Sequence, residues 1–179
     1  MPSHCNLSSS AGLKDVYTSI CLFLDMNAGS VPSPCACTSV RRVARVLARV
    51  YDASLAGSGM NVTQLAVMRA ILRHRKEPLT RVAEDLEMDR TSLYRALTSL
   101  QRKKWVNLSG GADNRSLTAT VTERGYATLS KADPRWARVQ TAVVDAFGDA
   151  SWKTFVLELQ HLSECANAIT VGQPSDVRS

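Results

Sequence analysis

Residues 78–104 read PLTRVAEDLEMDRTSLYRALTSLQRKK, and residues 105–121 continue as WVNLSGGADNRSLTATV. The first segment predicts two helices that are separated only by the connection at 87–88. Pro78 suits the first turn of the earlier helix, and Asp89 is a good N-cap for the later one. Apolar residues recur at helical spacing in both helices. Two short helices joined so closely predict a helix-turn-helix.

The second segment predicts a β-hairpin. Residues 105–108 and 117–121 read as its two strands, and residues 109–115 form a glycine-rich turn between them. A hairpin that directly follows a helix-turn-helix is a wing. We therefore expect residues from about 61 to 121 to form a winged helix-turn-helix.

Helical patterns also precede the two helices of 78–104. Residues 38–56 carry an apolar stripe and stop near the glycines of 57–59. Asn61 and Gln64 have the spacing of a capping box, which predicts the start of another helix that runs to about His74. Residues 1–34 read as a flexible extension with one short helix.

Two further helices follow the wing. Thr122 is expected to cap a long helix that reaches Phe147 and bends near Pro134, and Asp149 to cap a last helix. Its apolar residues are expected to face inward: Trp152, Phe155, Val156, Leu159, Leu162 and Ile169. Residues 171–179 read as a tail. The predicted fold is mainly α with a small β-wing, flanked by N- and C-terminal helices.

Composition and charge narrow the class of protein. With 179 residues, of which 45% are hydrophobic, the chain favours one domain with a single sizeable core. A net charge of +6 favours anionic partners such as nucleic acid. Since no run approaches the ~18 apolar residues of a membrane span, we expect no membrane insertion. The first ten residues lack the features of a signal peptide, which favours the cytoplasm.

The helix from Arg90 to Lys104 has the chemistry of a DNA-reading helix. Its length of about 22 Å would let it lie along a major groove. The predicted contacts to bases come from Arg90, Thr91, Ser92, Tyr94 and Arg95, and those to phosphates from Arg102, Lys103 and Lys104. Exposed basic residues on a helix are often only a solvated face. Their occurrence between a tight turn and a wing that carries Arg115 favours double-stranded DNA.

The same residues carry a family resemblance. The stretches LQRKKWV at 100–106, DNR at 113–115 and VTERG at 121–125 resemble the signature of MarR-family regulators. The resemblance covers about 40–170 and implies a winged-helix domain over 35–170 that acts as a homodimer. The family's first and last helices interlock as a dimerisation domain, here about 38–56 and 122–170. The resemblance also implies pseudo-palindromic operators and the function of a transcriptional regulator, most often a repressor.

In that family the wing and its flanks have defined roles. By resemblance, Asp113 braces the wing and Arg115 enters the minor groove, whose negative potential attracts arginine. Two positions depart from the pattern. Lys104 replaces the usual helix-ending glycine, at a cost of about 1 kcal/mol if its backbone is left-handed, and Asn114 replaces a basic wing residue.

Two cysteines suggest how DNA binding is controlled. Cys35 and Cys37 stand just before the helix of 38–56, and a helix N-terminus lowers a thiol pKa. OhrR-like hydroperoxide sensors of the same family place a tyrosine fourteen residues after their reactive cysteine, and Cys37 and Tyr51 have this spacing. A second tyrosine expected in that arrangement is Arg41 here. We hypothesise that oxidation of Cys37 repacks the dimer; a buried structural thiol is the alternative.

The sequence leaves two other classes of effector open, a metalloid ion and a small aromatic acid. Cys35 and Cys37 are spaced to chelate a soft metalloid ion, although the sequence identifies no third ligand. Many relatives respond instead to small aromatic acids, and Trp136 and His74 are candidates to line such a cleft.

The sequence argues against an enzyme. Its histidines stand in no recognisable catalytic arrangement, and it has no phosphate-binding glycine loop. We expect no cofactor and no structural zinc site, because the cysteines lack zinc-finger spacing. The competing interpretations are a winged-helix module that binds protein, and a thiol peroxidase that uses Cys37.

Overall fold

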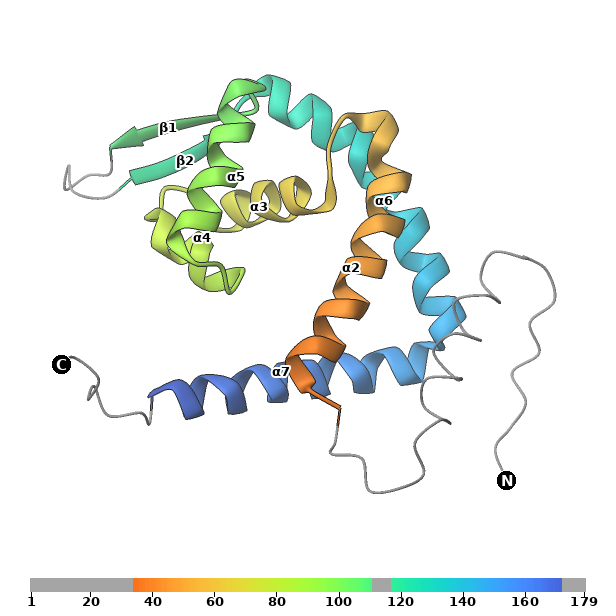
Figure 1. The fold of residues 1–179 in the computed structure, drawn as a ribbon. Coiled ribbons are helices and arrows are strands. Elements are labelled where there is room, and N and C mark those ends of the chain that lie inside the picture. The colour runs from red at the N-terminus through yellow and green to blue at the C-terminus, as the bar shows by residue number, and fades with distance from the viewer. Residues whose placement is uncertain (1–33, 111–116, 172–179) are drawn as a thin grey trace, which may run out of the picture. The chain divides into compact units, whose positions relative to one another are not determined.

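The computed structural model describes residues 34–110 and 117–171 (Figure 1). The expectations for residues 1–33, for Asp113 and Arg115 in the wing turn, and for residues 172–179 lie outside this part. The elements are α2 (Ala36–Leu55), a short 3₁₀ turn (Ala56–Ser58), α3 (Val62–Arg73), α4 (Leu79–Asp85), α5 (Arg90–Arg102), β1 (Val106–Gly110), β2 (Leu117–Val121), α6 (Glu123–Phe147) and α7 (Asp149–Val171).

Internal contacts divide the chain within α2 into two compact units, which meet between Arg45 and Val46. Residues 34–45 are all exposed. The part from Val46 onward contains the core and the winged helix-turn-helix. No helix of the described residues is long and apolar enough to cross a membrane.

The junction between α2 and α3 confirms the predicted caps. Gly59 has a left-handed backbone with φ of 75°, as expected where a helix ends at glycine. The Asn61 side chain accepts a hydrogen bond from the Gln64 backbone N–H at 2.8 Å, and Gln64 Oε1 accepts one from the Asn61 N–H at 3.2 Å. The capping box is therefore complete, and the Asp52 carboxylate accepts a further bond from the Val62 N–H at 2.7 Å.

The helix-turn-helix is present as predicted. Pro78 is the cap residue of α4, which has seven residues and hence about two turns. Glu87 turns the chain with a left-handed φ of 48°, and the Met88 N–H donates to the Ala83 carbonyl at 2.9 Å. The turn thus returns directly to Asp89, which caps α5.

Helix α5 is shorter than predicted. It ends at Arg102 after 13 residues, about 20 Å, rather than at Lys104. The Trp105 N–H donates to the Leu100 carbonyl at 3.0 Å, which turns the chain towards β1 and lets the Trp105 ring enter the core. Lys104 takes a left-handed φ of 58° at this turn, the conformation that usually favours glycine.

The core lies between α3, α5 and the wing. Buried apolar residues of α3 and α5 belong to one cluster with Trp105 and Val106, and the largest fully buried ones include Leu65, Met68, Ile71, Leu93, Leu97 and Leu100. The two strands are antiparallel, and their register runs from Val106 opposite Val121 to Gly110 opposite Leu117. This core fixes α5 with one face inward and the other exposed.

The wing is joined tightly to α6. Thr122 caps α6 as predicted, because its hydroxyl accepts the Gly125 N–H at 3.0 Å. The Thr122 N–H donates to the Trp105 carbonyl at 2.9 Å. Gly125 is buried, and a Cβ at this position would lie 2.3 Å from that carbonyl oxygen. Only glycine lets the first turn of α6 approach the start of β1 so closely.

The prediction that the apolar residues of α7 face inward is wrong for three of the six, whereas Trp152, Phe155 and Val156 are half-buried. Leu159, Leu162 and Ile169 are 36%, 42% and 70% exposed. Phe155 contacts Phe147 of α6, with ring centroids 5.6 Å apart, and is only half-buried. Asp149 is the first residue of α7 rather than a cap before it. Helical spacing predicts an apolar face, but the face is buried only where another surface covers it.

Candidate nucleic-acid interface

The start of α5 is fixed by its cap. The Asp89 carboxylate accepts the Ser92 hydroxyl at 2.6 Å and the Ser92 backbone N–H at 2.9 Å. These two bonds, the hydroxyl first, lower the pKa of Asp89 below its ordinary value. Ser92, which the sequence suggested as a base contact, thus has its hydroxyl engaged in the cap. The Asp89 side chain thus satisfies one of the backbone N–H groups that the start of a helix leaves without an intrahelical partner.

The exposed face of α5 gathers most of the predicted base-contacting residues. A shallow depression of about 530 Å³ is lined by Arg90, Thr91, Tyr94, Arg95 and Thr98. The Arg90 guanidinium carbon lies 5.7 Å from the centre of the Tyr94 ring, a cation–π distance. The structure therefore places two arginines, one tyrosine and two hydroxyls on one surface.

Thr98 is the member of this surface that the sequence analysis missed. Its hydroxyl donates to the Tyr94 carbonyl at 2.8 Å, and the residue is exposed. Residues four apart share a helix face, so the spacing from Tyr94 could have identified it.

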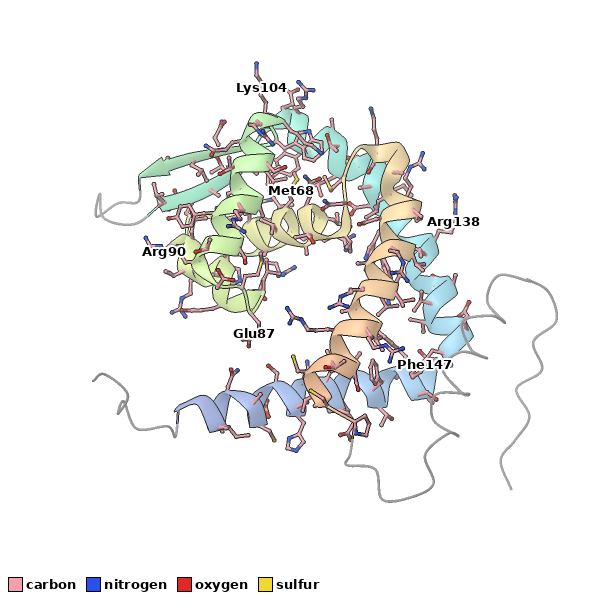
Figure 2. The ribbon with its side chains drawn as sticks, in the orientation of Figure 1. Met68, Glu87, Arg90, Lys104, Arg138 and Phe147 are labelled. Atoms are coloured by element: carbon pink, nitrogen blue, oxygen red, sulfur yellow. The ribbon has the colours of Figure 1, made fainter. Side chains whose placement is uncertain are left out.

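The basic residues at the other end of α5 divide into two groups. Arg102 and Lys104 are exposed, as contacts to phosphate require, and Figure 2 shows the Lys104 side chain pointing outward. Lys103 instead folds back: its Nζ donates to the Gly59 carbonyl at 2.7 Å and lies 4.2 Å from the centre of the Trp105 ring. The expectation that Lys103 projects towards phosphates is therefore wrong.

A buried glutamine links α3 to α5. Gln64 is 7% exposed, and its Nε2 donates to the Ser99 hydroxyl at 3.1 Å while its Oε1 accepts from Lys103 Nζ at 3.2 Å. The sequence identified only its capping role. The same side chain also holds the last two turns of α5 against the start of α3.

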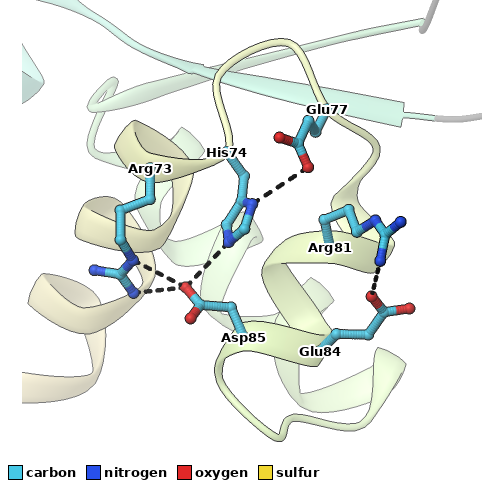
Figure 3. Close-up of polar contacts among 6 residues, drawn as sticks. All are labelled: Arg73, His74, Glu77, Arg81, Glu84 and Asp85. Atoms are coloured by element: carbon cyan, nitrogen blue, oxygen red, sulfur yellow. Dashed lines mark hydrogen bonds and ion pairs between the residues drawn. The ribbon is translucent and has the colours of Figure 1, made fainter.

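Charged residues hold the end of α3 against α4, the first helix of the helix-turn-helix (Figure 3). Two guanidinium nitrogens of Arg73 donate to one oxygen of Asp85, at 2.6 and 3.1 Å, and chiefly this pairing lowers the pKa of Asp85. The His74 ring lies between carboxylates, with Nε2 3.3 Å from Asp85 and Nδ1 3.3 Å from Glu77. His74 therefore packs in the corner between α3 and α4, and the expectation that it lines an effector cleft is wrong.

Trp136, the other residue expected to line an effector cleft, packs against neighbouring side chains instead. Its ring lies 4.0 Å below the Arg69 guanidinium, and Arg69 forms an ion pair with Asp133 at 2.7 Å. The ring packs against the core cluster. A different depression, of about 350 Å³, is lined by Gly57, Lys131, Pro134, Arg135 and Arg138.

Cys35, just before α2, and Cys37, its second residue, are both exposed in the described chain. The Thr38 hydroxyl lowers the pKa of the Cys35 thiol, helped by the Thr38 backbone N–H. These bonds stabilise the Cys35 thiolate. In the other part of the chain, Tyr51 is buried, which raises its pKa, and its hydroxyl donates to Gln140 Oε1 at 2.5 Å.

A two-helix corner, an exposed basic helix and a wing define a winged helix-turn-helix DNA-binding protein. The model of the IclR helix-turn-helix domain matches residues 64–108. None of the curated proteins matches the chain. Among solved structures, the transcriptional regulator MosR from M. tuberculosis in complex with DNA is 32% identical, with a TM-score of 0.70, over 75% of this chain and 98% of MosR.

Two more distant structures share the fold. PcaV from Streptomyces coelicolor, in complex with its natural ligand, is 15% identical over 78% of this chain and 99% of its own, with a TM-score of 0.68. A MarR/EmrR family regulator from Acinetobacter sp. ADP1 is 16% identical over 74% and 95%, with a TM-score of 0.65. The chain belongs to the MarR family of DNA-binding transcriptional regulators. These comparisons point to a regulator and not to an enzyme.

Proposed function

We propose that the protein is a sequence-specific repressor that binds a pseudo-palindromic operator as a homodimer in the cytoplasm. The observation that carries this proposal is the exposed face of α5, where Arg90, Tyr94 and Arg95 lie together. Arginine forms paired hydrogen bonds with guanine in the major groove, whereas Arg102 and Lys104 at the other end suit phosphates. Asp113 and Arg115 retain their proposed roles in the wing.

The uncovered apolar residues support a homodimer. Leu162 and Ile169 of α7 are exposed together with Phe147 at the end of α6, and Val50 of α2 is 43% exposed. Exposed apolar surface of this kind favours association at about 25 cal/mol for each Å² that becomes buried. A second copy would cover these apolar residues of α7, α6 and α2. The α5 helix of that copy would read the other half of a palindrome.

An oxidant that reacts with a thiol is the first effector class. The Cys35 thiolate would attack one oxygen of a hydroperoxide, break the O–O bond and form a sulfenic acid, while the other oxygen leaves as an alcohol after taking a proton. The Cys37 thiol, two residues away, could then displace water to form a disulfide. We propose Cys35 as the attacking thiol in place of Cys37, because hydrogen bonds from Thr38 stabilise its thiolate.

A small aromatic acid is the second effector class. The depression beside Gly57 is lined by Lys131, Arg135 and Arg138 together with Pro134, so it offers cations to a carboxylate and an apolar wall to a ring. Salicylate is a suitable probe. Release of the protein from DNA by salicylate, with loss of the effect in Arg138→Ala, would favour this class over oxidation.

The test is a mobility-shift titration on genomic fragments that span the gene's own promoter. We expect saturable binding of one fragment with a preference that persists when the salt concentration is raised. Cumene hydroperoxide should abolish that shift, Cys35→Ser should prevent the loss, and the matched Ser39→Ala variant should behave as wild type. Equal binding to all fragments would refute the sequence-specific regulator, and transcription that rises on binding would refute the repressor.

A further inference from the structure

The exposed face of α5 holds apolar groups beside its two arginines. The Tyr94 ring and Thr98 are four residues apart and therefore share one side of the helix. Both line the same depression as Arg90 and Arg95, the predicted contacts to bases. Arginine recognises guanine, so a second kind of contact is needed to recognise the A·T pairs of an operator. The apolar groups of this surface are suited to that contact.

A hydrogen bond to its own helix orients the Thr98 side chain. The hydroxyl donates to the Tyr94 carbonyl at 2.8 Å, and the residue is exposed. Threonine carries a hydroxyl and a methyl group on the same carbon, and here the backbone takes the proton of the hydroxyl. The methyl group is the branch that remains for an outside partner. Thr98 therefore offers an apolar group to the major groove.

Among the four DNA bases, only thymine displays a methyl group in the major groove, and the threonine methyl is one of the side-chain groups that contact it. Thr98 follows Arg95 by three residues, a rise of about 4.5 Å along the helix, whereas base pairs are stacked about 3.4 Å apart. We propose that the Thr98 methyl group reads a thymine within about two base pairs of the guanine that Arg95 contacts. This inference rests on the proposed sequence-specific binding.

The test removes the same contact once from the DNA and once from the protein. The probe is the preferred promoter fragment, amplified with either thymidine or deoxyuridine triphosphate, because uracil lacks only the C5 methyl group of thymine. Thr98→Ser is the counterpart in the protein, since serine keeps the hydroxyl that bonds to the Tyr94 carbonyl and loses the methyl group. Anisotropy titrations with the full-length protein give the affinities of all combinations.

Wild-type protein should bind the uracil fragment at least about fourfold more weakly for each half-site, the value of one buried methyl group. Thr98→Ser should bind the thymine fragment about fourfold more weakly for each half-site. It should also lose less than wild type when uracil replaces thymine, because one partner of the contact is already absent. A loss on uracil that is as large in Thr98→Ser as in wild type would overturn the thymine contact.

Two further variants isolate the methyl group. Thr98→Val keeps a methyl group and lacks the hydroxyl, so it should respond to uracil as wild type does. If Thr98→Val loses affinity and Thr98→Ser does not, the hydroxyl reads the base and the proposal is overturned. Thr154→Ser is the matched control, because Thr154 is an exposed threonine of α7 whose hydroxyl donates to the Ala150 carbonyl at 3.2 Å. It should bind both fragments as wild type does.

Single substitutions in the fragment locate the contact. The guanine that Arg95 contacts is the one whose replacement by adenine weakens binding of wild type but not of Arg95→Ala. One thymine within about two base pairs of it should account for the difference between wild type and Thr98→Ser. A coupled thymine further away would overturn the spacing that the helix rise predicts.

Binding of random DNA separates base reading from a structural defect. Thr98→Ser should bind random DNA as wild type does, with the same salt dependence, because non-specific binding depends on phosphate contacts. Equal weakening on random DNA and on the promoter fragment would overturn the proposal. Equal affinity of wild type for the thymine and uracil fragments would also overturn it, and the sequence-specific regulator would stand. If wild type prefers no fragment over random DNA, the proposed function is refuted together with this inference.

Discussion

Replacing Gly125 with alanine should weaken the contact between the first turn of α6 and the start of the wing. The added Cβ would lie 2.3 Å from the Trp105 carbonyl oxygen and 2.8 Å from a methyl carbon of Val121. Carbon and oxygen atoms normally approach to about 3.3 Å, so the carbonyl must move by about 1 Å. That carbonyl accepts the Thr122 N–H at 2.9 Å, and a shift of this size weakens the bond. We expect Gly125→Ala to destabilise the protein by about 3 kcal/mol.

Urea unfolding followed by circular dichroism measures this cost, with Gly57→Ala as the matched control. A Cβ at Gly57 meets only the end of the Arg135 side chain, at 2.7 Å, and that flexible side chain can move away. The control should therefore change the free energy of unfolding by less than about 0.5 kcal/mol. If Gly125→Ala unfolds at the same urea concentration as Gly57→Ala, the close approach of α6 to Trp105 is not as described.

Three further predictions follow from single residues. Lys104→Gly should stabilise the protein by up to about 1 kcal/mol in urea unfolding, because glycine takes the left-handed φ without strain. Pairing with Arg73 lowers the folded pKa of Asp85, so the stabilisation from this pair is present above the unfolded pKa of about 3.9 and is lost as pH falls through the folded value. Asp85→Asn should therefore be less stable than wild type at neutral pH, and the difference should shrink as the pH is lowered through the acid range. Arg95→Ala should weaken operator binding in an anisotropy titration by about 1–3 kcal/mol. The control variant Arg81→Ala, which removes an exposed ion pair on α4, should leave operator binding unchanged.

Local cap and turn chemistry made much of the fold predictable. Asn61, Asp89 and Thr122 were expected to start helices, and each side chain accepts a backbone N–H in the structure. These motifs depend on residues within three positions of one another, so the sequence contains all of their partners. The left-handed backbone at Lys104 was anticipated only through the family resemblance.

Contacts between distant segments could not be predicted in the same way. The bond from Lys103 to the Gly59 carbonyl and that from Gln64 to Ser99 join residues 44 and 35 positions apart. Charge suggested that Lys103 faces phosphate, but the packing of α3 against α5 offers it a carbonyl and an aromatic ring instead. Likewise the periodicity of α7 gave an apolar face without saying whether the same chain covers it.

The most direct test of the central claim is the ratio of two affinities, for the preferred promoter fragment and for random DNA of equal length, at physiological salt. If the exposed face of α5 reads sequence in the major groove, the fragment should bind about 10³-fold more tightly or better. Arg95→Ala should reduce this ratio more than Arg102→Ala, because Arg102 is placed for phosphates. A ratio near one in the wild-type protein would contradict sequence reading by this helix.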